Sequence, residues 1–296
     1  METITWLPLD PPAAASLLRK FEGYSKIQGM LRSRALGFPT QRGFIVDPST
    51  ASEEEVLRAA AQLHPSRYLV RHDRAPEIGS YPQGGYIVGK SDLVEELAWY
   101  RGQGRLLILL RPADPLDNLY SAAVLLTSSK SFQLDVVGSG FDASDLNRGF
   151  ISPSESHGYS LPPETPPRKR SSAFIDDDTY AEFKSLRLRK IALKHVLRRR
   201  IFKTDDISTT EATSLVASDE IASKPQVRHL LSEEPYTRSP ESFLAQIAGY
   251  ALKAASLLDL PRLGESLLAF SVSQIDNGEH TVIWDIVLPR RKYGLL

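Results

Sequence analysis

The chain of 296 residues contains no cysteine. Disulfides, thiolate metal sites and cysteine nucleophiles are therefore excluded. Histidine is scarce as well, and the six histidines are scattered without the spacing of a zinc-binding pair. The nucleophile motif G-x-S-x-G is also absent. These absences turn attention to chemistry that depends on carboxylates, cations and the main chain.

The chain also lacks net charge and long apolar runs. Lys and Arg number 36, and so do Asp and Glu, so no overall field attracts nucleic acid or a membrane. No apolar run approaches the roughly 18 residues of a membrane span. Met1 to Trp6 lacks the basic and apolar pattern of a signal peptide. We expect a cytoplasmic protein with neither a membrane nor a nucleic acid as partner.

The densest pattern lies between Arg67 and Arg111. Three short apolar runs predict strands over residues 68–70, 86–88 and 106–110. The first run ends at Arg71, and a polar loop with Gln83-Gly84-Gly85 at its far end follows. Glycines let the main chain approach a ligand closely, so that its N–H groups point at anionic oxygens. A cation at a strand end facing such a flap predicts a polyphosphate site, with ATP as the first ligand to consider.

Helices and strands are predicted along most of the remaining chain. Helical periodicity predicts helices over residues 13–36, 52–63, 92–101, 180–203 and 241–258. Further β-prone runs cover residues 44–46, 122–126, 132–137, 267–272 and 281–287. Residues 138–180 are rich in Gly, Ser, Pro and Asp, and we interpret them as loop and linker. This mixture predicts an α+β protein.

The order of these elements resembles the ATP-grasp superfamily. Four segments carry the resemblance: Ser25-Lys26 with the turn Leu36 to Thr40 and the strand 44–46; Tyr68 to Arg71; Gln83 to Leu97; and the helix 241–258 with the turn Leu260 to Gly264 and the hairpin ending at Trp284 to Arg290. The resemblance implies two α+β lobes that enclose a nucleotide cleft, with a long insertion. The expected divisions are an N-terminal lobe, 1–66; a small lobe with its flap, 67–137; an insertion, 138–239; and the end of the large lobe, 240–296.

The resemblance also implies an activity and its residues. Such proteins use ATP and Mg²⁺ to join a small carboxylate to an amine through an acyl-phosphate, releasing ADP. The residues expected to hold ATP are Arg71, Gln83, Gly84, Gly85 and Arg111. Arg71 and Arg290 are the expected catalytic cations, and Asp285 is the expected Mg²⁺ ligand.

A separate candidate for the second substrate is the loop that follows the strand 132–137. It places Asp142, Asp145, Asn147 and Arg148 among glycines. Binding and catalytic residues concentrate in loops that a rigid scaffold positions. We expect these four residues to contact the substrate.

The chain departs from the family pattern at the closing hairpin. The pattern supplies two acids and an Asn, but Ser271 stands where the first acid is expected and Val287 where the Asn is. A degenerate nucleotide-binding scaffold is therefore an alternative. The Val70-Arg71 context favours another, a phosphotransferase of the phosphoenolpyruvate synthase type, which would need a partner protein. Association of two copies into a homodimer is a further alternative.

Overall fold

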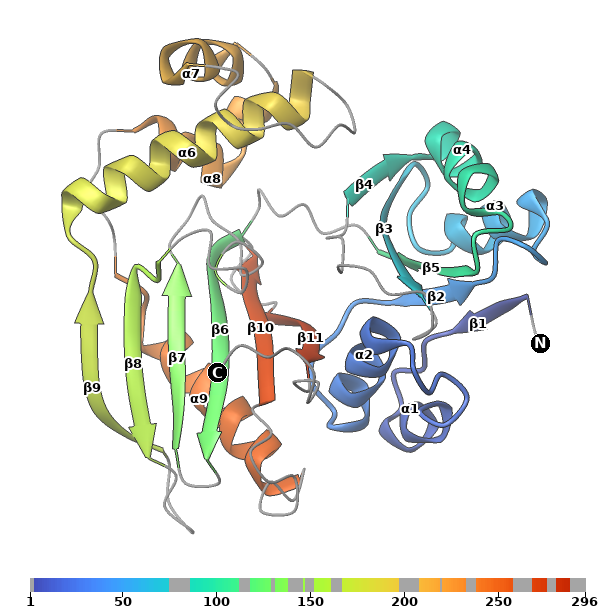
Figure 1. Ribbon diagram of the computed structural model, residues 1–296, viewed down its shortest axis with the longest axis horizontal. Coiled ribbons are helices and arrows are strands. Elements are labelled where there is room, and N and C mark those ends of the chain that lie inside the picture. The colour runs from blue at the N-terminus through green and yellow to red at the C-terminus, as the bar shows by residue number, and fades with distance from the viewer. Residues whose placement is uncertain are drawn as a thin grey trace. The chain divides into compact units, whose positions relative to one another are not determined.

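The computed structural model describes residues 3–74, 86–111, 118–128, 131–137, 146, 152–160, 167–196, 208–218, 220–232, 238–257, 268–275 and 281–287 (Figure 1). The chain divides into two compact units, residues 1–114 with 282–296, and residues 115–281. The divisions expected after residues 66, 137 and 239 stay predictions. Each unit has a sheet with helices, so the predicted α+β class is confirmed.

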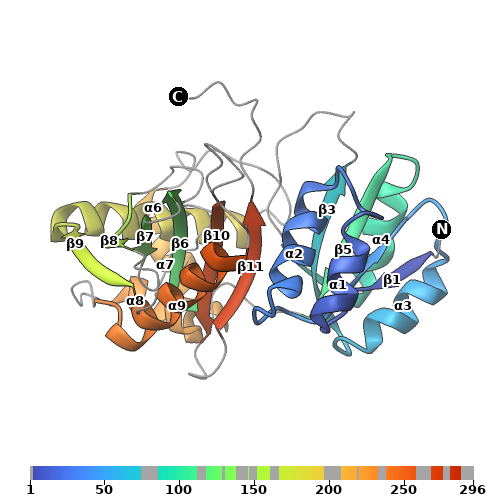
Figure 2. The ribbon, with the colours of Figure 1, turned by 90° about the horizontal axis from the view of Figure 1, so that it is seen from below.

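The first unit contains a five-stranded sheet in which every strand pair is antiparallel. Its strands, in spatial order, are β1 (Ile4–Trp6), β2 (Gly43–Val46), β5 (Arg105–Leu110), β3 (Arg67–Arg74) and β4 (Tyr86–Gly89). Helices α1 (Pro11–Leu17) and α2 (Ser25–Ala35) cover one face of this sheet, and α3 (Glu53–Ala61) and α4 (Lys90–Tyr100) cover the other (Figure 2).

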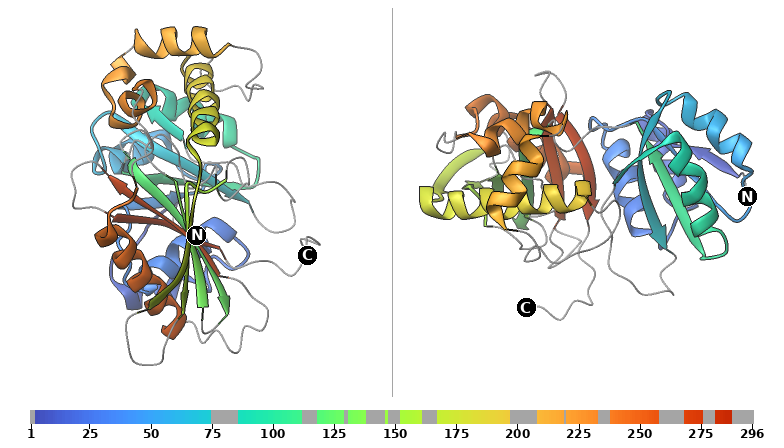
Figure 3. Two further views of the ribbon diagram at one scale, coloured as in Figure 1. Left: turned by 90° about the vertical axis from the view of Figure 1, so that its left-hand side faces the viewer. Right: turned by 90° about the horizontal axis from the view of Figure 1, so that it is seen from above.

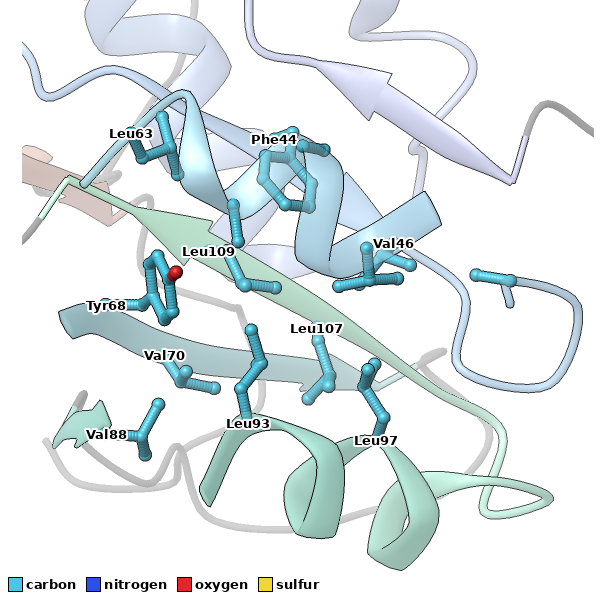
Figure 4. Packing of buried hydrophobic residues seen from close by; sticks show 14 of the residues in the cluster. Phe44, Val46, Leu63, Tyr68, Val70, Val88, Leu93, Leu97, Leu107 and Leu109 are labelled. Carbon is cyan, nitrogen blue, oxygen red and sulfur yellow. The ribbon is translucent and has the colours of Figure 1, made fainter. Parts of the chain in front are cut away.

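Two apolar layers hold the first unit together. The layer beneath α3 and α4 includes Tyr68, Val70, Leu93, Leu97 and Leu107, which interleave between sheet and helices (Figure 4). The layer beneath α1 and α2 is built on Ile27, Leu31, Leu69, Ile108 and Leu110. Each fully buried side chain of this size contributes about 1.5–3 kcal/mol relative to exposure. Strands β2 and β5 are the best-buried strands of this unit, and the apolar residues of β3 are buried beside β5.

Local signals account for most helix boundaries. Gly23 and Gly37 adopt positive φ angles of 89° and 66°, which end the helical segments before them. Ser52 and Glu55 form a capping box at the start of α3, as the sequence predicts. Helix α4 differs, because it begins at Lys90 with Gly89 as N-cap and no side-chain cap bond. The predicted start at Asp92 is therefore two residues late.

The second sheet has six strands in the order β11-β10-β6-β7-β8-β9. The second unit contains all of these strands except β11, of which only Thr281 falls within that unit. The strands are β6 (Asn118–Ser128), β7 (Ser131–Val137), β8 (Glu155–Ser160), β9 (Arg168–Phe174), β10 (Leu268–Ile275) and β11 (Thr281–Val287). Strands β8 and β9 lie in the region interpreted as loop and linker, so that interpretation is wrong there. Their main chains complete hydrogen-bonded ladders with β7 and with each other, which compensates for polar side chains.

Helices cover one face and one end of the second sheet. Helix α9 (Glu241–Leu257) lies against one face of the sheet (Figure 3), where Phe243 stacks near Tyr120 of β6. Beyond the strand ends lie α6 (Asp177–Val196), α7 (Thr209–Ala217), the 3-10 helix η3 (Glu220–Ser223) and α8 (Pro225–Leu231). No helix within the described ranges is both long and apolar enough to span a membrane.

Candidate functional site

Arg71 lies inside strand β3 and not at its end, so the predicted strand end is wrong. The strand continues to Arg74, and Arg71 pairs with Ile108 of β5. Leu69 packs beneath α1 and α2, so the alternation of a strand places Arg71 and Asp73 on that face and His72 and Arg74 on the opposite face. The strand continues beyond Arg71 because the polar residues that follow form hydrogen bonds with other parts of the fold.

Asp73 is the buried anchor of this region. Its Oδ2 accepts hydrogen bonds from the main-chain N–H groups of Lys26, at 2.7 Å, and Ile27, at 3.0 Å. Its Oδ1 accepts from the N–H of Arg74 at 2.9 Å. Burial raises the pKa of Asp73, while these three N–H donors oppose the rise by stabilising the carboxylate. Tyr24, the N-cap of α2, makes no side-chain cap bond, so Asp73 caps the helix from β3.

Lys26 brings a second cation to the face on which Arg71 lies. Its side chain is 6% exposed, and Nζ donates to the carbonyl oxygen of His72 at 2.9 Å. The sequence places Lys26 in a segment of the ATP-grasp resemblance but does not mark it as a site residue. Lys26 is recognised as a site residue only in the fold, where the start of α2 packs against the end of β3.

His72 lies on the opposite face with Tyr100. The Tyr100 hydroxyl is 3.4 Å from Nδ1 of His72, and both side chains are buried. Burial and, to a smaller extent, the nearby cations Lys26, Arg74 and Arg71 together lower the pKa of His72 to about 4. The imidazole is therefore neutral at neutral pH and adds no charge to the cations around it.

Replacing His72 by Gln should remove one source of acid sensitivity. The folded pKa of about 4 lies below the ordinary 6.5, so the unfolded chain takes up a proton first as the pH falls through this interval. The free energy of unfolding of the original chain should therefore fall relative to that of His72→Gln between pH 6.5 and 4 and stay parallel above it. Urea unfolding at a series of pH values measures this difference, and a constant difference would contradict the assignment.

Arg74 and Arg105 add two further cations. They face each other across the β3–β5 ladder, an arrangement that costs stability unless the charges are compensated. The Arg105 guanidinium lies 5.5 Å from the ring centroid of Tyr100, a cation–π distance that provides part of this compensation. We call Lys26, Arg71, His72, Asp73, Arg74 and Arg105 the β3 cluster. It lies where the chain leaves β3 toward the glycine-rich segment.

Arg111, another predicted nucleotide residue, does not join the β3 cluster. Arg111 is exposed directly after β5, and its N–H donates to the carbonyl oxygen of Arg42 at 2.8 Å. Because Arg71 pairs with Ile108, Arg111 lies three residues further along, and alternation puts their side chains on opposite faces. The structure therefore does not bring Arg71 and Arg111 together on one face.

Most of the remaining predicted site residues lie outside the described part of the chain. These are Gln83, Gly84, Gly85, Asp142, Asp145, Asn147, Arg148 and Arg290. Asp285 lies on β11, but its side chain is not among those described. Within the described ranges, no three His, Asp or Glu side chains are grouped so as to hold a metal ion.

The segment Gly84 to Ser91 fits a second phosphate pattern, G-x-x-x-x-G-K-[ST]. In a phosphate-binding P-loop, these residues form a loop between a strand and a helix. Here Tyr86 to Gly89 are strand β4, and they pair with Val70 to Arg67 of β3. The exposed Lys90 is the first residue of α4. Tyr86, Ile87 and Val88, which are three of the four middle residues of the pattern, therefore do not wrap a phosphate in the manner of a P-loop.

Comparisons with known proteins give a likeness to solved structures but none to a family model or curated protein. Among solved structures, the chain is similar to D-alanyl-alanine synthetase A from Vibrio cholerae O1 biovar eltor str. N16961, with a TM-score of 0.38 and 11% sequence identity. The match covers 93% of this chain and 57% of that chain.

Proposed function

We propose that the chain is a cytoplasmic, ATP- and Mg²⁺-dependent ligase that joins a small carboxylate to an amine and releases ADP. The β3 cluster is the observation that supports this proposal. It places two cations, Lys26 and Arg71, on the same face of β3 as one carboxylate, Asp73. Two further cations, Arg74 and Arg105, pair on the opposite face at the end of the strand that leads into Gln83-Gly84-Gly85. This excess of positive charge fits the negative charge of a triphosphate.

Each residue of the cluster has a distinct task in this proposal. Arg71 presents a planar fork of N–H donors that suits phosphate oxygens, and Lys26 adds a point charge on the same face. Asp73 holds the main chain of Lys26 through its N–H. Bound ATP supplies the phosphoryl group that activates the substrate carboxylate. Mg²⁺ ligation is assigned to Asp285, and contact with the second substrate to the loop after β7.

Calorimetry with a non-hydrolysable ATP analogue tests the proposal. We expect saturable binding that strengthens when Mg²⁺ is added, because the cation neutralises part of the phosphate charge. Arg67→Ala is the matched control for Arg71→Ala, since Arg67 is an exposed cation on the same strand and face as Arg71. The control variant should bind the analogue as the unmodified chain does. Absence of binding to the unmodified chain would refute the proposed function.

A nucleotide-binding scaffold without catalysis is a second candidate. Ser271, where the family pattern has its first acid, lies on β10 and pairs with Ala123 of β6. A single carboxylate can suffice for Mg²⁺ when phosphate oxygens complete its coordination, but binding is then weaker. Nucleotide binding that is unaffected by Mg²⁺ and is not accompanied by ADP formation would favour the scaffold. A phosphotransferase of the phosphoenolpyruvate synthase type would instead form ADP or AMP only with a partner protein.

A further inference from the structure

Among the strands that the structure describes, β9 is an edge of the second sheet. It is the last strand in the sheet order, and all of its residues, Arg168 to Phe174, are exposed (Figure 1). Edge strands present unpaired main-chain groups, and proteins usually keep them short or cover them. β9 has seven residues, which is long enough to pair with an added strand.

The hydrogen-bond alternation identifies main-chain groups that face away from β8. The N–H of Ile175 donates to the carbonyl oxygen of Ser154 at 2.9 Å, which makes this a hydrogen-bonded pair. Bonded and non-bonded pairs alternate in an antiparallel ladder. Phe174 and Ser172, opposite Glu155 and His157, are then the non-bonded positions, and their N–H and C=O groups point to the open edge.

Positive charge is concentrated at the Arg168 end of this edge, although the whole chain is neutral and the exposed acids Asp176 to Asp178 follow the other end. Arg168, Lys169 and Arg170 occupy one end of β9. At the other end, the guanidinium of Arg238 lies 3.9 Å from the ring centroid of Phe174. Glu241 approaches Lys169 at 3.3 Å, but this pair is exposed and therefore weak. An occupant of the edge that carries carboxylates would match these cations.

We propose that β9 binds an extended acidic peptide segment of a partner protein by strand addition. The main chain of the peptide pairs with Ser172 and Phe174, and its carboxylates lie near Arg168, Arg170 and Arg238. A second copy of β9 fits less well, because antiparallel pairing would bring Arg168 to Arg170 of one copy toward Arg238 of the other. Single-stranded nucleic acid usually requires several stacking rings, whereas β9 offers one, Phe174.

Fluorescence anisotropy with the full chain and a labelled nine-residue peptide of alternating Glu and Val tests this proposal. We expect saturable binding that weakens as salt is added. Ser172→Pro removes an outward N–H without removing a bond to β8, and should weaken binding at least 10-fold. The double variant Arg168→Glu, Arg170→Glu should weaken it similarly. Arg228→Glu, at an exposed position on α8, is the charge control and should bind as the original chain does.

Several outcomes would overturn the proposal. They are no binding of the peptide, unchanged binding in the double variant, equal loss in Arg228→Glu, and tighter binding of a single-stranded oligonucleotide than of the peptide. If circular dichroism shows that Ser172→Pro is unfolded, a peptide with alternate N-methyl groups replaces it, because it lacks the N–H donors of one edge. Equal affinity of the methylated and plain peptides would exclude strand addition. None of these results depends on nucleotide binding.

Discussion

Arg71→Ala should lower ATP-dependent product formation by about 10²–10³-fold, the loss typical when one donor to a developing negative charge is removed. Arg71 is half-buried in the centre of β3, where a guanidinium acts more strongly than in bulk water. Its removal leaves the β3 cluster with less charge on the face that Lys26 shares. The measurement is ADP release in the presence of candidate carboxylates and amines, with analogue affinity determined in parallel.

Two matched variants separate a functional loss from a structural one. Arg67→Ala removes a cation from the same strand and face, at an exposed position, and should leave turnover within about 2-fold, because an exposed charge this far along the strand is screened. Arg71→Lys keeps the charge but loses the fork, so turnover should be intermediate. Full activity in Arg71→Ala would show that the active site does not lie at β3.

Glu155→Ala should destabilise the second unit by about 3–5 kcal/mol, because it leaves several buried hydrogen-bond donors without an acceptor at about 1–3 kcal/mol each. The Glu155 carboxylate is 1% exposed and accepts from the Ser239 N–H at 2.5 Å and from the Ser239 hydroxyl at 3.0 Å. It also lies 2.9 Å from Nε2 of His157, whose side chain is equally buried. Alanine would leave all of these polar groups without an acceptor.

Urea unfolding and amide hydrogen exchange in β8 measure this loss. Glu182→Ala is the control, since Glu182 is exposed on α6, and it should change the free energy of unfolding by no more than about 0.5 kcal/mol. Glu155→Gln should fall between the two, because an amide oxygen still accepts one hydrogen bond. A loss for Glu155→Ala as small as that of the control would mean that the carboxylate contributes nothing to the attachment of Ser239 and α9.

Local signals predicted the first unit better than the second. Periodicity and the glycine at position 37 located α2, and the capping box located α3. Strands β8 and β9 escaped prediction because Ser, Gly, His, Lys and Arg dominate them, and their stability comes from ladders with residues far along the chain. β-propensity is a property of the packed sheet more than of the segment.

The candidate site was predicted only in part for the same reason. Arg71 was singled out by the residues around it, although its strand runs three residues further than expected. Asp73 and Lys26 were not, because their contact joins positions 47 residues apart. Nothing in either segment alone indicates that a carboxylate on β3 completes the first turn of α2. Sequence patterns report neighbours along the chain, whereas this site is assembled by tertiary packing.

The order of strands in the first sheet has a consequence for synthesis on the ribosome. β5 lies between β2 and β3, so these two earlier strands have no ladder to each other. A nascent chain that has not yet exposed residues 105–110 can form only the separate β1–β2 and β3–β4 pairs and cannot join them into one sheet. Non-local pairing of this kind slows folding, so chains that stall before Leu110 should be clients of chaperones.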